Sequence, residues 1–345
     1  MIHNYFNKFS NCFFIAEIGV NHNGDLKLAK EMIDAAVISG ADAVKFQTFK
    51  AELLVSKGTP KVKYQERTTI SNESHFNMIK NLELSHEDHF ILKEYCEKNN
   101  IMFLSTPYDV ESANFLHRSL DIEIFKTSSA DLIDQPLHEY IATSGKPSIV
   151  SVGMATLGEI EETLAIYQKY QNLDVILLHC VSKYPCSHES LNLRVMNTLR
   201  EAFNLPIGYS DHSIGLEAAV LSVALGAKII EKHFTLDKKL PGPDHLASSL
   251  PEEFKQLCES VKIAEKALGT SVKTCQAEES QMAEVSRKSI VMRKSVKAGT
   301  LLSAQNLTIK RPGNGLPPSF LKNLIGLKLS VDKKFDDLVN LKDIE

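Results

Sequence analysis

The sequence predicts an α/β fold, a (β/α)8 TIM barrel followed by a small, mostly β domain, and three observations predict it. About eight short runs rich in Ile, Val and Phe alternate with amphipathic segments between residues 13 and 234. These runs are apolar almost throughout, as in the strands of a parallel sheet that helices cover. After them, the pattern changes to a polar stretch and then to short apolar runs broken by Gly, Pro and Asn.

Each predicted strand is followed by a predicted helix, which is the order of elements in a barrel. Strands are expected at 13–19, 42–49, 101–106, 122–128, 147–153, 174–180, 206–212 and 228–234. Apolar residues at helical spacing predict helices at 26–39, 86–98, 109–118, 135–144, 156–170, 192–203, 215–225 and 252–267. An open, doubly wound parallel sheet is the alternative with the same order of elements.

The barrel is therefore expected to occupy residues 1–268. Residues 269–285 are polar and lack a strand pattern, so they are interpreted as a partly helical linker. Residues 286–345 form the small domain, which has little core of its own and is expected to dock on another surface.

Charge and composition exclude several classes of partner. Lys and Arg total 39 against 43 Asp and Glu, a net charge of -4, and no basic block is present to bind nucleic acid. The first residues lack the features of a signal peptide and no apolar run is long enough to span a membrane, so we expect a cytoplasmic protein. The six cysteines are scattered without CxxC spacing, which argues against a zinc knuckle or a disulfide framework.

Polar residues follow every predicted strand, at the end of a barrel where the loops converge and chemistry takes place. They are Glu17, Lys45, Gln47, Ser105, Thr106, Lys126, Ser128, Ser129, Asp131, Ser151, His179, Ser182, Tyr184, Ser210, Asp211, His212, Glu231 and His233. Two lysines ringed by hydroxyl groups suit a bound phosphate and carboxylate.

Each of these residues also has a purely structural explanation. Glu17, Asp131 or Glu231 would neutralise the lysines, the hydroxyl groups would cap the helices that follow, and a single histidine would be a hydrogen-bonded core residue. Their coincidence at one end of the barrel is what favours a site.

Histidines close two adjacent predicted strands, the seventh and the eighth. His212 and His233 are expected to point into the same mouth and to share one divalent ion, with further positions left to substrate and water. Such an open site suits a Lewis acid that acts on a carbonyl group. Asp211 and Glu231 are candidates for orienting the imidazoles, unless alternation along the strands turns them outward.

Seven segments stand in order through nearly the whole chain: FIAEIGVNHNGDLKLAKEMIDAAVISGADAVKFQTFK, FLSTPYD, FKTSSADL, IVSVGMAT, LLHCVSKYP, IGYSDHSIGLEAAVLSVALGAKIIEKHFTLDKKLPGPDH and KRPGNGLPP. Together they resemble the sialic acid synthases, which include N-acetylneuraminate, legionaminate and pseudaminate synthases. The resemblance implies a barrel followed by an antifreeze-like domain, called SAF, that reaches over the barrel mouth of the partner subunit in a domain-swapped homodimer.

The resemblance also implies a transferase reaction in which phosphoenolpyruvate condenses with an N-acetylated hexosamine to a nine-carbon 2-keto sugar acid. Phosphate is released by cleavage of the C–O bond. The acceptor would be N-acetylmannosamine or 2,4-diacetamido-2,4,6-trideoxymannose, two sugars that differ at positions read by loop residues such as those in 57–76.

Site residues follow from the same resemblance. Phosphoenolpyruvate would bind Lys45, Thr106, Lys126, Ser129, Ser151 and Ser210, with Ser182 as a weaker candidate. His212 and His233 would hold Mn2+ or Mg2+, and Glu17 or Asp131 would move protons. The sugar would meet Glu17, Gln47, Tyr184 and Asp244, with Asp131 nearby, while Arg311 of the other subunit would hold the acetamido group.

The chain departs from the neuraminate-type pattern at two places. The segment SSAD replaces GSGE, which puts Ser128 in place of a glycine and Asp131 in place of a longer Glu. Ser182 stands where that pattern has an asparagine, which removes an amide from the phosphoenolpyruvate site. The PGPDH segment is intact, which favours the neuraminate and legionaminate branches over the pseudaminate branch.

Two other functions fit parts of the sequence. A Schiff-base pyruvate aldolase would use Lys126 or Lys45 as its nucleophile, but it gives the histidine pair no role. An ice-binding or interaction protein would use the tail as its active surface, yet KRPGNGLPP is a charged, irregular segment and not a flat, Thr-rich face.

Overall fold

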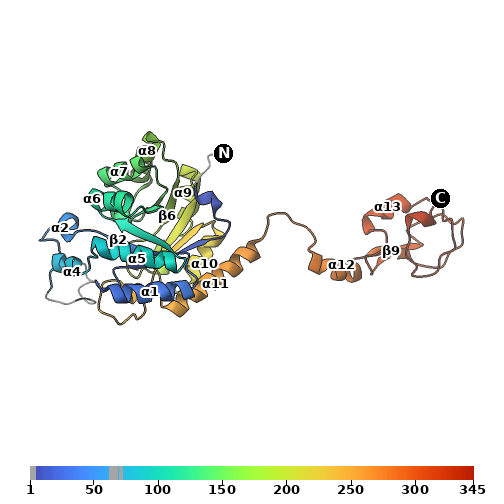
Figure 1. The fold of residues 1–345 in the computed structure, drawn as a ribbon. Coiled ribbons are helices and arrows are strands. Elements are labelled where there is room, and N and C mark those ends of the chain that lie inside the picture. Colours follow the sequence, from blue (N-terminus) through green and yellow to red (C-terminus); the bar gives the residue numbers. More distant parts are fainter. Residues whose placement is uncertain (1–4, 62–68, 70–72) are drawn as a thin grey trace. The chain divides into compact units, whose positions relative to one another are not determined.

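The computed structural model describes residues 5–61, 69 and 73–345, and it divides the chain into two compact units between Gly269 and Thr270. Eight parallel strands of the first unit form one sheet in the order β3-β2-β1-β8-β7-β6-β5-β4 (Figure 1). The two outer members of this order, β3 and β4, contact each other, so the sheet curves into a near-closed barrel. This arrangement confirms the predicted barrel and excludes the doubly wound sheet, whose strand order reverses within the sheet.

All eight predicted strands are present. They are β1 (Phe13–Gly19), β2 (Ala43–Thr48), β3 (Met102–Pro107), β4 (Phe125–Thr127), β5 (Ser148–Ser151), β6 (Val175–His179), β7 (Ile207–Asp211) and β8 (Ile229–His233). Residues 62–68 and 70–72 of the 57–76 loop, to which we assigned sugar recognition, lie outside the described residues.

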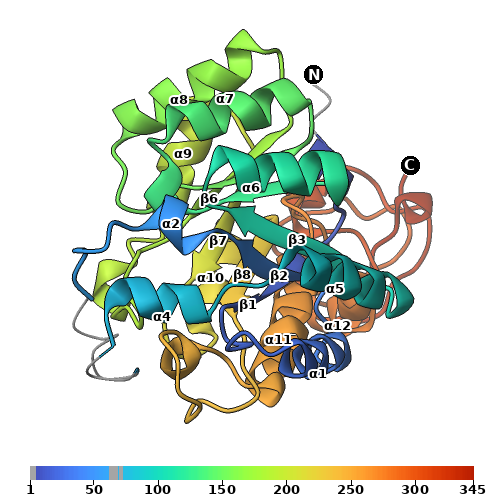
Figure 2. The ribbon, with the colours of Figure 1, turned by 60° about the vertical axis from the view of Figure 1, so that its left-hand side comes forward.

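The predicted helices are present too, with ends that differ by a few residues. They are α1 (Leu26–Ile38), α5 (His86–Lys98), α6 (Val110–Asn114), α7 (Gln135–Ser144), α8 (Leu157–Lys169), α9 (Val195–Phe203), α10 (Glu217–Ala224) and α11 (Pro251–Leu268). A π-helical turn at Phe115–Ser119 continues α6. The sequence analysis missed two short helices, α2 (Ala51–Leu54) and α4 (His75–Asn81). Figure 2 shows α1, α5 and α11 side by side outside the strands.

Local hydrogen bonds start several of these helices where the chain leaves the strands. The side chain of Asp25 accepts hydrogen bonds from the backbone N–H groups of the first turn of α1. Ser85 and Thr156 begin α5 and α8 with reciprocal capping boxes. Such caps satisfy backbone donors that have no partner within the helix, so each helix begins at a defined residue after the loop.

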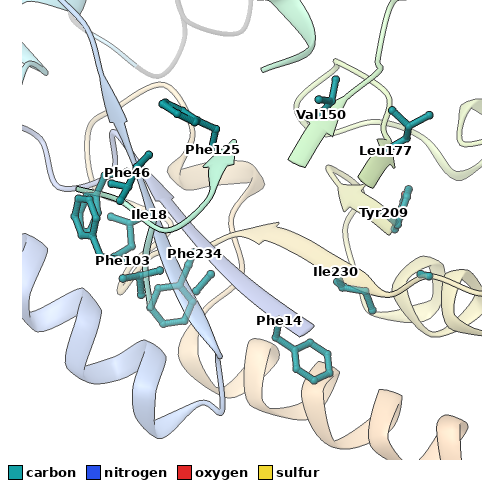
Figure 3. Close-up of a cluster of buried hydrophobic side chains, with 14 of the residues drawn as sticks. Phe14, Ile18, Phe46, Phe103, Phe125, Val150, Leu177, Tyr209, Ile230 and Phe234 are labelled. Atoms are coloured by element: carbon teal, nitrogen blue, oxygen red, sulfur yellow. The ribbon is translucent and has the colours of Figure 1, made fainter. Parts of the chain in front are cut away.

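Two apolar layers hold the barrel together. The outer layer lies between strands and helices and includes Phe14, Phe46, Phe125, Tyr209 and Ile230, all buried (Figure 3). The inner layer lies inside the barrel and is formed by Phe6, Ile15, Ala43, Leu104, Ile124, Ile149, Ile176, Leu178 and Ile229. Phe6 comes from a 3-10 turn, Tyr5–Lys8, before β1, and its side chain is fully buried in this inner layer.

The second unit has a small core of its own. Strands β9 (Ser289–Met292) and β10 (Leu307–Lys310) pair antiparallel, and the helices of this unit are α12 (Ser280–Ser286) and α13 (Leu321–Leu324). Its buried side chains are Ile290, Met292, Leu302, Leu307, Leu324, Leu329 and Val339. Among residues 5–61, 69 and 73–345, no helix combines the length and the apolar character needed to cross a membrane.

A buried histidine in α7, a helix of the first unit, predicts how the free energy of unfolding depends on pH. His138 of α7 is fully buried, with Nε2 3.1 Å from the backbone oxygen of Asp131 and Nδ1 3.0 Å from the Tyr167 hydroxyl. Burial lowers the pKa of His138 from 6.5 to about 4. Between these two pH values the unfolded chain binds a proton that the folded chain does not, so the free energy of unfolding falls as pH falls.

We expect this single group to remove up to ~3 kcal/mol of stability between about pH 6.5 and about pH 4. Urea unfolding across this range measures it. His138→Gln keeps a donor and an acceptor but does not titrate, so its stability should depend less steeply on pH than that of the wild type. His188→Gln changes an exposed histidine and is the control. Equal pH dependence in His138→Gln and the wild type would contradict the assignment.

Candidate functional site

A cavity of about 410 Å3 opens at the carboxyl ends of the barrel strands. Eleven of the predicted catalytic, substrate and metal residues line it: Glu17, Lys45, Gln47, Thr106, Lys126, Ser129, Ser151, Ser182, Tyr184, Ser210 and His212. Two further polar residues expected at the strand ends, Ser128 and Glu231, line it as well. The eleven come from seven different strands or the loops after them, so the closure of the barrel is what gathers them.

Four of the lining residues form a cluster of buried charges. Lys45 Nζ lies 2.5 Å from a carboxylate oxygen of Glu17 and donates a hydrogen bond of 2.9 Å to the Thr106 hydroxyl. Lys126 Nζ lies 3.4 Å from Glu231. All four residues are at most 5% exposed. Each lysine thus has a carboxylate partner, as buried ammonium ions require.

The two carboxylates of this cluster differ in their affinity for a proton. Burial raises the pKa of Glu17 to about 7, although Lys45 opposes the shift. Burial also disfavours ionised Glu231, but Lys126 and Lys45 together outweigh it and hold the pKa of Glu231 below its usual value. Glu231 is therefore a permanent anion, whereas Glu17 can take up and release a proton near neutral pH.

Hydroxyl groups line the side of the cavity formed by β4, β5 and β6. The Gly153 N–H donates a hydrogen bond of 2.9 Å to Ser129 Oγ, which also lies 2.9 Å from Cys180 Sγ. Ser151 Oγ is buried and has no hydrogen-bond partner among the described residues. These groups surround Gly153 so closely that a Cβ atom there would lie 2.6 Å from Ser182 Oγ. We call Ser129, Ser151, Gly153, Cys180 and Ser182 the hydroxyl cradle.

Two imidazole rings face each other across the ends of β7 and β8. The ring centroids of His212 and His233 are 5.5 Å apart, and the Tyr184 ring packs against both, at 4.2 Å and 5.4 Å. Burial lowers the pKa of both histidines, so both rings are neutral, which is the form that binds metal ions.

The nitrogen atoms of this pair suit a cation. His212 Nδ1 lies 2.8 Å from the backbone oxygen of Val181, to which it donates, so its Nε2 carries a lone pair; this atom lies 3.5 Å from the Ser210 hydroxyl. His233 Nδ1 is buried and has no hydrogen-bond partner within the described part of the chain. No group of three or more His, Cys, Asp and Glu side chains suited to a metal occurs among residues 5–61, 69 and 73–345. A divalent ion would therefore have these two protein ligands and several open positions.

The two residues expected to orient the imidazoles, Asp211 and Glu231, make no hydrogen bond to either ring. Asp211 points away from the cavity, where its carboxylate accepts a hydrogen bond of 2.6 Å from Lys232. Glu231 points inward but accepts from Ser210 Oγ at 3.1 Å and pairs with Lys126. The group that orients His212 is the Val181 carbonyl, which no residue type could have indicated because it is backbone.

Alternation along the strands turns other strand-end residues outward. Ser105 Oγ bonds the Thr48 hydroxyl at 2.6 Å, and His179 Nε2 lies 2.7 Å from the backbone oxygen of Leu191. Neither residue lines the cavity. Both were expected at the mouth only because they stand near the end of a strand.

Four of the predicted catalytic, substrate and metal residues lie outside the lining of the cavity: His233, whose ring packs against His212, and Asp131, Asp244 and Arg311. Asp131 accepts a hydrogen bond of 2.6 Å from Ser128, and burial raises its pKa to about 6. Burial also raises the pKa of Asp244 to about 6, with Lys45 opposing the shift. Arg311 belongs to the second unit and is exposed.

Five residues of the lining were not predicted: His75, Tyr108, Ala130, Met154 and Cys180. Tyr108 directly follows β3 and Cys180 directly follows β6, so the strand-end rule applied one residue further would have found them. His75 begins α4, a helix that the sequence analysis missed, and nothing in its neighbourhood indicated it.

Comparisons with known proteins agree with this geometry. Residues 32–273 match the NeuB family and residues 287–345 match the SAF domain. The chain is 44% identical to the N,N'-diacetyllegionaminic acid synthase of Legionella pneumophila, over 93% of this chain and 91% of that one. It is also 44% identical to the protein of the same name from Campylobacter jejuni, over 94% and 98%. A solved structure, the N-acetylneuraminic acid (sialic acid) synthetase of Leptospira borgpetersenii, superposes with a TM-score of 0.69 at 39% identity, over 79% of this chain and 90% of that one.

The crowding at Gly153 gives a test of the hydroxyl cradle. In Gly153→Ala the new Cβ would lie 2.6 Å from Ser182 Oγ, 2.8 Å from Cys180 Sγ and 2.9 Å from Ser129 Oγ, so these groups must move. We expect binding of inorganic phosphate and phosphoenolpyruvate, measured by calorimetry, to weaken about tenfold or more.

Gly158→Ala is the matched control, because a Cβ at that position would meet only Thr156 Oγ1, at 4.0 Å. Its affinity for both anions should equal that of the wild type. Unchanged affinity in Gly153→Ala would show that the cradle does not bind the anion.

Proposed function

The chain belongs to the NeuB family, and on that premise we propose that it condenses phosphoenolpyruvate with an N-acetylated hexosamine to a nine-carbon 2-keto sugar acid. Its relatives are synthases of sialic-acid-type sugars. The observation that carries the proposal is the cavity itself, in which two buried lysines and a set of hydroxyl groups lie beside two neutral imidazoles.

Phosphoenolpyruvate carries a phosphate and a carboxylate close together, and the cavity offers donors for both. Lys45, Lys126 and Thr106 supply charge and hydrogen bonds at the bottom, and Ser129, Ser151 and Ser210 supply hydroxyl groups at the side. Hydrogen bonds in which one partner is charged are stronger than those between neutral groups. As the reaction shifts negative charge onto the leaving phosphate, these same groups stabilise it.

Glu17 is the group that we assign to proton transfer, because it lines the cavity and its pKa is raised to about 7. The third carbon of phosphoenolpyruvate attacks the aldehyde carbon of the open-chain sugar, and the aldehyde oxygen takes a proton from Glu17. Water then adds to the second carbon and gives a proton back to Glu17. The bond between this carbon and the phosphate oxygen then breaks, the new hydroxyl group passes its proton to the departing phosphate, and the 2-keto group remains.

We assign a divalent ion, Mn2+ or Mg2+, to His212 and His233. The neutral rings, the lone pair on Nε2 of His212 and the unpartnered Nδ1 of His233 support this assignment. When bound, the ion polarises the carbonyl of the acceptor sugar as a Lewis acid. The Val181 carbonyl keeps the His212 ring in the tautomer and orientation that this role requires.

The acceptor sugar is assigned to Gln47, Tyr184 and Asp244, with Asp131 nearby, and its acetamido group to Arg311 of the partner subunit in a domain-swapped homodimer. Two relatives named N,N'-diacetyllegionaminic acid synthase share 44% of their aligned residues with this chain. This identity supports 2,4-diacetamido-2,4,6-trideoxymannose over N-acetylmannosamine as the preferred acceptor.

A Schiff-base aldolase on the same barrel is not favoured. Burial lowers the pKa of Lys126, as that chemistry needs, but Lys126 pairs with Glu231 and donates to the backbone oxygen of Thr127 at 3.2 Å. Such an enzyme would have no use for the two facing imidazoles.

Phosphate release from phosphoenolpyruvate tests the proposed function directly. Purified enzyme should release phosphate only when an acceptor sugar is present, with a higher kcat/KM for the trideoxy sugar than for N-acetylmannosamine. A chelator should abolish the reaction, and added Mn2+ or Mg2+ should restore it. Borohydride with pyruvate should trap no adduct. A covalent adduct together with full activity in the chelator would overturn the proposal.

Complementation between two inactive variants tests the role of Arg311. Arg311→Ala should raise the KM for the sugar about tenfold or more, with a much smaller change for phosphoenolpyruvate, because only the sugar would lose a contact. Mixing it with His212→Ala should restore part of the activity, since one site of each heterodimer would be complete. Arg293→Ala, which changes another exposed arginine of the second unit, is the control. If verified heterodimers regain no activity, Arg311 does not act in the site of the partner subunit.

A further inference from the structure

A buried ion pair lies on the outer side of the barrel wall, directly behind the two histidines. Lys232 Nζ is 2.6 Å from Asp211 Oδ2, and their side chains are 3% and 0% exposed. The two residues are register partners on β7 and β8. Asp211 precedes His212 and Lys232 precedes His233, so the pair joins the two strands one residue before each imidazole.

The same pair also fixes the residue after His212. Asp211 Oδ1 accepts hydrogen bonds from the Ser213 N–H at 2.9 Å and the Ser213 hydroxyl at 2.7 Å, as well as from the Tyr209 hydroxyl at 3.2 Å. Lys232 Nζ donates a further bond of 2.7 Å to the backbone oxygen of Ser213. His212 therefore stands between two residues that are both tied to the end of β8.

Stability alone is a poor explanation for this arrangement. Two well-packed apolar residues in place of a buried ion pair are often neutral or stabilising, because burial of charge is costly. An ion pair with directional hydrogen bonds fixes the positions of the residues that it joins, whereas an apolar pair does not. Here the positions that it defines are those of the two strand ends that carry His212 and His233.

The geometry points to Asp211 and Lys232 as positioning residues that set the separation and orientation of the two imidazoles, and hence the affinity for the divalent ion. This inference rests on the proposed function, since it takes His212 and His233 as the ligands of the ion. Of the phosphoenolpyruvate contacts assigned above, only Ser210 lies on β7, next to Asp211; Lys45, Lys126 and the hydroxyl cradle lie on other strands, so phosphoenolpyruvate affinity should depend on the pair far less than Mn2+ affinity does.

The test removes the charges but keeps the bulk, in the double variant Asp211→Leu with Lys232→Met. The full chain is freed of metal with a chelator, and its affinity for Mn2+ alone is measured from the electron paramagnetic resonance signal of free Mn2+. We expect the Kd for Mn2+ to rise about tenfold or more, as for other loss of groups behind metal-binding histidines. The Kd for phosphoenolpyruvate, measured by calorimetry, should stay within about twofold of the wild type.

A second double variant, Glu139→Gln with Lys169→Met, removes an exposed ion pair between α7 and α8 and should change neither affinity. Urea unfolding shows whether each variant is folded. If the first double variant does not fold, Lys232→Arg replaces it; this variant keeps the charge but not the geometry and should weaken Mn2+ binding in the same direction.

Three results would overturn the inference. Unchanged Mn2+ affinity in a folded variant would leave the pair a purely structural role. An equal loss of Mn2+ and phosphoenolpyruvate affinity would indicate general loosening of the barrel mouth. If the wild type itself binds no Mn2+, the metal assignment fails and the inference fails with it. Measurement of the wild type alone distinguishes this result from a failure of the inference about the ion pair.

Discussion

The burial of two lysines at one end of the barrel is the constraint on which the rest of the site depends. An ammonium ion that is shielded from water costs several kcal/mol unless a carboxylate neutralises it, so Lys45 and Lys126 need Glu17 and Glu231. The four charges sum to zero. When an anion binds beside the lysines, protonation of Glu17 keeps the cluster balanced, and the raised pKa of Glu17 places this change near neutral pH. In the proposed reaction, binding of the anion would therefore favour the protonated form of Glu17 that proton transfer requires.

The barrel supports this charged layer because side chains alternate along each strand. Ile15, Leu104, Ile149 and Ile229 belong to the inner apolar layer, and the residues two positions further along each strand line the cavity. The change from the apolar core to the polar cavity therefore takes only two residues along each of these strands, the period at which side chains point to the same face. In β7 this inner position is Gly208, because a Cβ there would lie 2.5 Å from Leu178 Cδ2.

The sequence predicted the barrel and most of the cavity because both follow from short-range rules. Apolar strands between helices indicate the fold, and polar strand ends in such a fold converge, which correctly brought together residues as distant as Glu17 and Ser210. The same rules could not say which of two neighbouring strand-end residues faces inward. Asp211 and His179 were therefore expected at the cavity, but alternation along the strand turns their side chains away from it. His75 and the Val181 carbonyl depend on loop conformation, which residue type alone does not determine.

Three buried polar atoms at the barrel mouth lack a protein partner among the described residues. Ser151 Oγ, His233 Nδ1 and Glu231 Oε2 are buried and lack a hydrogen-bond partner among the described residues. Each such atom costs about 1–3 kcal/mol, and protein interiors satisfy most of them. All three belong to the barrel mouth: the hydroxyl group suits an anion, the imidazole nitrogen a cation, and the carboxylate oxygen a donor. A single apolar ligand would satisfy none of them, whereas the proposed anion, divalent ion and hydroxylated sugar would give each of them a partner, which supports the proposed function.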